Sequence, residues 1–157
     1  WNSCQIDDES VNLLAHGLKG NKHLKALSVK NCGLSDKNVG ALVLALAQNG
    51  SLQELDLGYN QCCTATLACL TYLLEESQCK LTRLSLDNQN VEKEEDAFDI
   101  IRLAGALSTD SDLKYLDLSG NRLDNDDLLQ LATALKANTT LEALHLWDNK
   151  LTDRGGC

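Results

Sequence analysis

One motif recurs five times along the chain at nearly constant spacing. It reads L-x-x-L-x-L-x-x-N/C-x-L, and the copy at residues 52–62 has the sequence LQELDLGYNQC. The five copies begin at Leu24, Leu52, Leu81, Leu113 and Leu141. Their spacings are therefore 28, 29, 32 and 28 residues. A period of this length indicates a stack of small units, each of which buries its apolar face against its neighbours.

The first half of each copy has the two-residue period of a β-strand. In the second copy Leu55 and Leu57 point to one side of the chain, while Glu54 and Asp56 point to the other. Each copy therefore predicts a short strand, and successive copies predict a parallel sheet.

After each strand the period changes to that of a helix. Apolar residues then recur at steps of three and four, as expected for the buried stripe of a helix that returns the chain to the next strand. The stripes are Val39, Leu42 and Leu46, then Leu67, Leu70 and Leu74, and later Leu128, Leu131 and Leu135. Strands pack about 4.8 Å apart and helices roughly 10 Å apart, so the stack must curve. We predict one α/β domain over residues 1–157, a horseshoe with the sheet on its concave face and helices on its convex face.

Polar residues at two fixed places in the repeat have a structural interpretation. Asn60, Asn121 and Asn149, at the ninth motif position, are expected to turn inward and satisfy backbone groups where each strand ends. Cys32 occupies the same position, and Gln89 departs from the pattern.

A second set of polar residues stands where the helices are expected to end. It consists of Asn21, Asn49, Asp110 and Asn138. We predict that they close the last helical turn in left-handed geometry. Asn49 and Asn138 also match the glycosylation sequon, and the capping interpretation argues against that use.

Charge and cysteine content narrow the classes of partner and compartment. The chain carries 14 Lys and Arg against 23 Asp and Glu, a net charge of −9. Such an excess repels phosphate backbones and anionic lipid, so neither nucleic acid nor a membrane is an expected partner. The seven cysteines lack the spacing of a disulfide framework, and we expect reduced thiols and a cytoplasmic protein.

No motif in the sequence predicts catalysis. Cys62, Cys63, Cys69 and Cys79 match no standard zinc spacing, and Cys62 occupies a core position of the repeat. The histidines lie far apart in the repeat frame, and no phosphate-binding glycine loop is present. We therefore expect no catalytic residue, no cofactor and no metal, and a protein that is not an enzyme.

The outward side chains of the strands form the candidate binding face. Three of the six aromatic residues of the chain fall on it, beside an excess of carboxylates. Exposed Tyr and Trp beside carboxylates are typical of protein interfaces. The candidate residues are Glu54, Asp56, Tyr59, Arg83, Asp87, Tyr115, Asp117, His145, Trp147 and Asp148. They predict a protein partner with a basic surface, although aromatic residues on a sheet also pack across strands.

Further residues place the repeats in a family. Cys32 alternates with Asn60 at the ninth position, and residues 131–141 read LATALKANTTL. In these features the chain resembles the ribonuclease-inhibitor class of leucine-rich repeats, closest in style to NLR receptors and Ran GTPase activators. The resemblance implies protein binding on the curved surface.

Three functional hypotheses remain open at the level of sequence. The leading one is the sensing or autoregulatory repeat domain of an intracellular NLR-like receptor. The alternatives are an inhibitor or regulator of an enzyme or small GTPase, and a tropomodulin-like cytoskeletal protein. A partial first copy at Trp1, Cys4 and Ile6 predicts a fragment of a larger protein that self-associates through uncapped ends. The charged run at 92–96 is interpreted as a solvated insertion or, alternatively, a binding loop.

Overall fold

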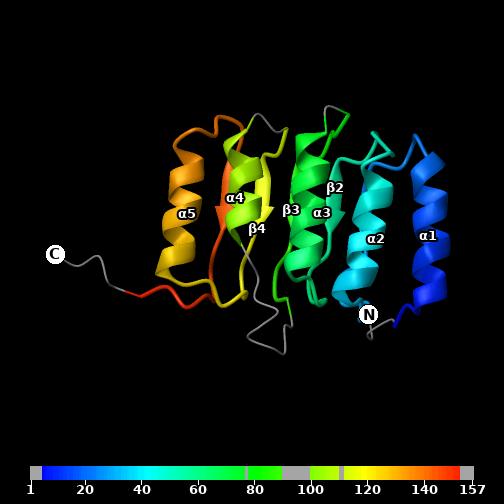
Figure 1. Cartoon of the computed structure of the whole chain (residues 1–157), viewed down its shortest axis with the longest axis horizontal. Helices are drawn as coiled ribbons and strands as arrows, with labels where there is room; N and C mark the ends of the chain where they lie inside the picture. Colours follow the sequence, from blue (N-terminus) through cyan, green and yellow to red (C-terminus); the bar gives the residue numbers. More distant parts are fainter. Residues whose placement is uncertain (1–4, 77, 90–99, 110–111, 153–157) are drawn as a thin grey trace.

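The computed structural model describes residues 5–76, 78–89, 100–109 and 112–152, in which short strands alternate with helices (Figure 1). The strands are β1 (Ala26–Ser28), β2 (Glu54–Asp56), β3 (Arg83–Ser85), β4 (Tyr115–Asp117) and β5 (Ala143–His145). The helices are α1 (Asp8–Gly20), α2 (Asp36–Leu46), α3 (Thr64–Glu75), α4 (Ile100–Ser108) and α5 (Asn125–Leu135). The charged run at 92–96 lies outside these residues, as do Trp1 and Cys4.

All five strands form one parallel sheet in chain order, and the helices stand in a row on one side of it (Figure 1). Equivalent motif positions are aligned, so that Leu55 of β2 pairs with Leu27 of β1 and with Leu84 of β3. The register repeats from β3 to β5. The α/β solenoid predicted from the repeat is confirmed.

The core lies between the sheet and the helices, where the leucines of the two periods meet. Leu55 and Leu84 of the strands are buried, as are Leu67 and Leu103 of the helices. One member of the predicted stripes is wrong: Leu128 is exposed. It lies on α5, the last helix of the described chain, which has a helical neighbour on one side only. No helix within the described residues is long and apolar enough to cross a membrane.

The ninth motif position forms the predicted ladder of hydrogen bonds. Asn60 donates from Nδ2 to the carbonyl oxygens of Val29 and Leu57 at 3.0 and 2.9 Å, and its Oδ1 accepts from the backbone of Cys32 and Leu34. The buried amide thereby satisfies backbone groups of two repeats.

Gln89 continues this ladder although its residue type departs from the pattern. Its Oε1 accepts from the backbone nitrogen of Cys62 at 3.0 Å, and its Nε2 donates to the carbonyl of Leu57 at 3.1 Å. Its own backbone nitrogen donates to Oδ1 of Asn121 at 2.9 Å. The longer side chain therefore spans the same gap.

The predicted left-handed geometry at the helix ends is wrong. Asn21 has φ −79°, and neither Asn49 nor Asn138 is among the non-glycine residues with positive φ. The left-handed residue beside Asn49 is Gly50, with φ 66°. Asp110 lies outside the described residues.

These asparagines act through their side chains instead. Oδ1 of Asn49 accepts from the backbone nitrogens of Ser51 and Leu52, and its Nδ2 donates to the carbonyl of Leu18 at 2.8 Å. Asn138, which follows α5, makes the equivalent contacts: its Oδ1 accepts from the backbone of Thr140 and Leu141, and its Nδ2 donates to the carbonyl of Leu107 on α4. The amide of Asn49 is fully buried, so this sequon offers no site for a glycan in the folded protein.

A hydrogen-bonded cap at the N-terminus of α3 also links one repeat to the next. Cys63, the residue before α3, provides no side-chain cap. The Asp36 carboxylate of the preceding repeat accepts instead from the backbone nitrogens of Cys63, Ala65 and Thr66. A carboxylate at this end also complements the helix dipole.

Candidate functional site

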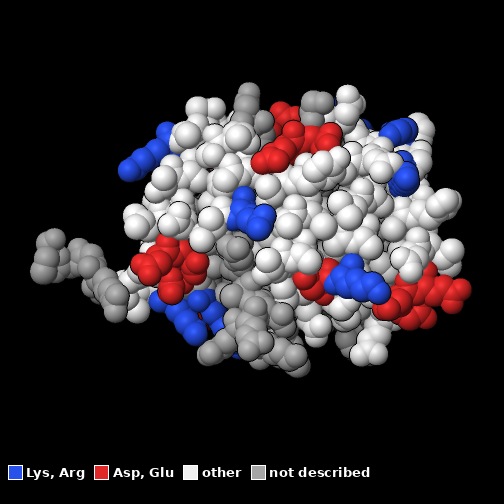
Figure 2. Space-filling view, viewed as in Figure 1, with Lys and Arg blue, Asp and Glu red and all other residues white. Residues whose placement is uncertain are grey.

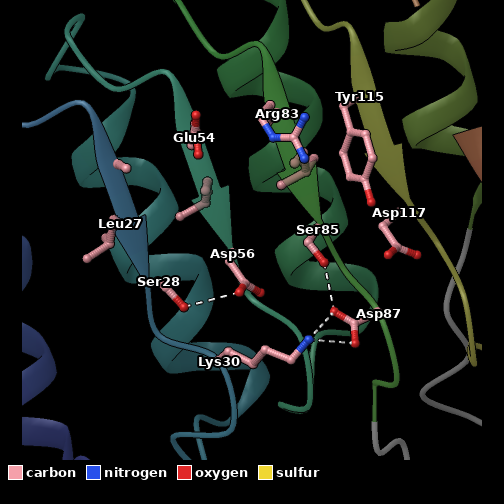
Figure 3. Close-up of a pocket in the computed structure, with 13 residues that line it drawn as sticks. Leu27, Ser28, Lys30, Glu54, Asp56, Arg83, Ser85, Asp87, Tyr115 and Asp117 are labelled. Atoms are coloured by element: carbon pink, nitrogen blue, oxygen red, sulfur yellow. Dashed lines mark hydrogen bonds and ion pairs between the residues drawn. The ribbon is translucent and has the colours of Figure 1, made fainter. Parts of the chain in front are cut away.

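The candidate site lies on the face of the sheet opposite the helices. A hollow of about 570 Å³ opens there across β1 to β4 (Figure 3). The small side chains of Ala26, Ser28 and Ser85 leave the space, while larger polar side chains surround it. Those larger side chains belong to Lys30, Glu54, Asp56, Arg83, Asp87, Tyr115 and Asp117.

One end of the hollow is closed by an ion pair that spans two repeats. Nζ of Lys30 lies 2.9 Å from Oδ2 of Asp87 (Figure 3). Gly58 occupies the equivalent position of the repeat between them. A Cβ atom on Gly58 would lie 2.2 Å from Oδ1 of Asp87. Glycine at this position therefore leaves room for the pair, which we call the brace.

The carboxylate of the brace is held by several donors. Besides Lys30, the Ser85 hydroxyl donates to Asp87 at 2.7 Å and the Asn88 amide at 3.2 Å. Burial raises the pKa of Asp87, but these hydrogen bonds outweigh it and hold the pKa below its ordinary value. For Lys30 the two effects have the opposite signs. Burial lowers the pKa of its ammonium group, but the hydrogen bonds to Asp87 outweigh burial and hold the pKa above its ordinary value.

Towards β5 the face carries rings and a guanidinium, which we call the aromatic row (Arg83, Tyr115 and His145). The Arg83 guanidinium lies 4.0 Å from the centre of the Tyr115 ring. The Tyr115 hydroxyl lies 3.0 Å from Nδ1 of His145, and the two rings meet edge to face at 4.9 Å. Burial raises the pKa of Tyr115, so its hydroxyl stays protonated at neutral pH.

Two large aromatic side chains project beyond these groups. Tyr59 is 48% exposed and Trp147 is 61% exposed. The Lys30 ammonium lies 5.0 Å from the centre of the Tyr59 ring. Both residues are accessible to a partner, and Trp147 lies two residues after the end of β5.

The backbone after each strand is left-handed at the eighth motif position, which the sequence analysis missed. The residues are Asn31, Tyr59, Asn88, Gly120 and Asp148, with φ between 53° and 68°. Asn, Gly and Asp tolerate this region, so their recurrence at that position was the available signal. Tyr59 is the one bulky residue among the five.

The predicted carboxylates fall into two groups. Glu54 and Asp148 are exposed, and Asp56 is half-buried, with hydrogen bonds from Ser28 and from the backbone of Gly58. Asp87 and Asp117 are 5% and 9% exposed. The first group is available to a partner, and the second is used within the protein.

Within the described residues, Cys62 belongs to the hydrophobic core, and Cys32, Cys69 and Cys79 pack against it. Burial raises the pKa of Cys62 strongly, and it also raises the pKa of Cys69 and Cys79, which disfavours the thiolate. No disulfide joins the five cysteines in the described part of the chain. Within the same residues, no group of three or more His, Cys, Asp or Glu side chains is placed to hold a metal ion.

Short parallel strands with an asparagine ladder and helices behind them define a leucine-rich-repeat solenoid. The family described as "Leucine Rich repeat" matches residues 20–43, 109–132 and 137–156. The chain belongs to the ribonuclease-inhibitor-like family of these repeats.

Two mouse relatives illustrate this membership. "Ribonuclease inhibitor" of Mus musculus is 33% identical over 120 residues, which cover 76% of this chain and 25% of the relative. "NACHT, LRR and PYD domains-containing protein 14" of Mus musculus is 32% identical over 121 residues, 76% of this chain and 12% of the relative. The chain thus spans a quarter or less of the length of the relatives it matches.

Proposed function

We propose that this chain is a module that binds a protein partner on the concave face of its sheet. The observation that carries the proposal is the hollow of about 570 Å³, with the accessible ring of Tyr59 5.0 Å from Lys30 of its lining. Tyr and Trp bury large apolar areas at low entropic cost, which suits a protein interface. The helical side is different: Figure 2, viewed as in Figure 1, shows side chains of both charges scattered over it without a continuous patch of one sign.

The accessible carboxylates favour basic groups on the partner. Glu54 and Asp148 are exposed, Asp56 is half-buried, and the net charge of the chain is −9. Opposite charges across an interface raise the association rate and improve specificity more than affinity. Because Asp87 and Asp117 are buried, we assign this role to the first three carboxylates only.

Each of the two relatives supports one version of the function. The similarity to a NACHT and LRR domain protein supports a sensing or autoregulatory repeat domain in an intracellular NLR-like receptor. The similarity to ribonuclease inhibitor supports an inhibitor or regulator of an enzyme. Both versions place the binding activity on the same repeat surface, and both suit a cytoplasmic protein with reduced thiols.

The ends of the stack support a second contact. Leu27 of β1 and Leu144 of β5 are only half-buried, whereas the equivalent Leu55, Leu84 and Leu116 are buried. We propose that the 157-residue chain self-associates through these ends. Sedimentation over a concentration series tests this, and a strictly monomeric chain at high concentration would contradict it.

The test of concave binding uses two tyrosines of equal exposure. Tyr59 on the concave side is 48% exposed, and Tyr72 on α3 is 50% exposed. The full chain captures its partner from cytosolic extract, and the binding is then measured for Tyr59→Asn and Tyr72→Asn. Asn is chosen because it tolerates the left-handed backbone at residue 59. We expect Tyr59→Asn to weaken binding and Tyr72→Asn to leave it unchanged; equal losses would move the site off the concave face.

A further inference from the structure

Arg83 is the cation of the hollow that has no carboxylate partner within the described residues. Lys30, the other cation lining the hollow, pairs with Asp87 at 2.9 Å. Arg83 contacts the ring of Tyr115, and none of its nitrogens forms an ion pair or a hydrogen bond with a described side chain. Its positive charge therefore remains available at the wall of the hollow.

The residue aligned with Arg83 on the neighbouring strand β2 does not pair with it. Glu54 is aligned with Arg83 across β2 and β3, yet the two side chains form no ion pair. Figure 3 shows Arg83 turned towards Tyr115 and away from Glu54. Because an arginine keeps its charge and holds its donors in a planar fork, stacking on the ring preorders it for a planar anionic group.

We propose that Arg83 binds a carboxylate of the protein partner, from an Asp or Glu side chain that enters the hollow. A carboxylate matches the guanidinium fork with two parallel hydrogen bonds. The hollow lies in the volume range of sites that bind small groups, roughly 300–1,000 Å³, so a side chain fits. This inference rests on the proposed function and gives its partner an acidic group over β3 beside the basic groups over β2.

The charges of the concave face then favour a partner in which a basic and an acidic group lie side by side. Glu54 and Asp56 on β2 favour a cation, and Arg83 on β3 favours an anion one strand away, about 4.8 Å across the sheet. A partner with only basic groups leaves Arg83 desolvated and unpaired, which costs affinity. A segment that carries an acidic and a basic side chain side by side satisfies both strands.

The test uses an isolated side chain as the probe. The ¹⁵N-labelled full chain is titrated with N-acetyl-glutamate methylamide at constant ionic strength, and N-acetyl-glutamine methylamide serves as the neutral probe. We expect the glutamate probe to shift the backbone amides of Arg83 and Tyr115, and the glutamine probe to leave them in place. Loss of the guanidinium in Arg83→Gln weakens this binding about tenfold.

Two variants control for charge and for folding. Arg102→Gln removes the same charge from the exposed surface of α4 and should leave the shifts intact. Arg83→Lys keeps the charge without the fork, and intermediate binding is expected. Equal shifts from both probes, or shifts that persist in Arg83→Gln, would overturn the role of Arg83. That failure is distinguishable from failure of the proposed function, because the Tyr59 and Tyr72 variants test partner binding without reference to Arg83.

Discussion

The two halves of the concave face use similar polar residues in opposite ways. From β1 to β3, Lys30 and Asp87 neutralise each other and Asp87 takes further hydrogen bonds from its neighbours. From β3 to β5, the Arg83 guanidinium lies over the Tyr115 ring and the His145 ring meets Tyr115 edge to face. Trp147 is exposed to solvent. The charges of the brace are paired within the protein, whereas the aromatic row leaves the Arg83 guanidinium available to a partner.

The difference originates at the seventh motif position. Lys30, Gly58 and Asp87 occupy it in consecutive repeats, and the missing side chain in the middle lets the outer two meet. Ser119 and Trp147 follow at the same position, where Trp147 remains 61% exposed. The glycine at this position therefore lets the charges of Lys30 and Asp87 pair within the protein.

The largest change in stability is expected from a side chain at Gly58, which would fill the space next to Asp87. Gly58→Ala places a methyl group against the Asp87 carboxylate and separates it from Lys30. We expect a loss of about 2 kcal/mol in the free energy of unfolding, from overpacking and lost hydrogen bonds. Gly105→Ala on α4 is the control, since a Cβ there meets nothing within 4 Å and helix propensity favours alanine. Urea unfolding measures both; a neutral Gly58→Ala would show that the brace contributes nothing.

A smaller effect is expected from Asp87→Asn, and it depends on pH. Folding lowers the pKa of Asp87, so its stabilisation is fully present above the unfolded value and is lost as the pH falls through the folded value. We expect the variant to be about 1 kcal/mol less stable than the wild type near neutral pH. The difference should shrink below about pH 4. Unfolding curves from pH 3 to pH 8 test this, and a difference that is constant with pH would contradict it.

The smallest effect is expected in the aromatic row. Tyr115→Phe removes the hydroxyl that contacts His145 but keeps the ring under Arg83. A hydrogen bond on a solvated face contributes modestly, and we expect a loss of about 0.5 kcal/mol. Thermal unfolding measures this loss of stability. A loss as large as that of Gly58→Ala would mean that the Tyr115–His145 contact stabilises the protein as much as the brace does.

The sequence was sufficient to predict the fold because every repeat has the same order of apolar and polar residues. The two-residue and helical periods predicted strands, helices, their order and the ninth-position ladder, in which Asn60 makes the expected bonds. The mechanism at the helix ends was wrong, since Asn49 uses its side chain where left-handed backbone was expected. Several hydrogen-bond geometries suit asparagine at a helix end, and residue type alone does not choose among them.

The site was less predictable because its contacts cross repeats. The alternation placed Asp87 on the outward face, but contacts with Lys30, Ser85 and Asn88 leave it only 5% exposed. The stack of Arg83 on Tyr115 depends in the same way on side-chain directions between strands. Periodicity assigns a side to each residue, whereas packing between neighbours decides which side chains stay accessible.

The central claim is that a protein binds the concave face, and one pair of affinities tests it most directly. Trp147 on that face and Leu129 on α5 are equally exposed, at 61% and 62%. For the captured partner we expect Trp147→Ala to cost about 2 kcal/mol, roughly 30-fold in Kd, and Leu129→Ala to leave Kd unchanged. Equal losses, or a loss confined to Leu129→Ala, would contradict the account.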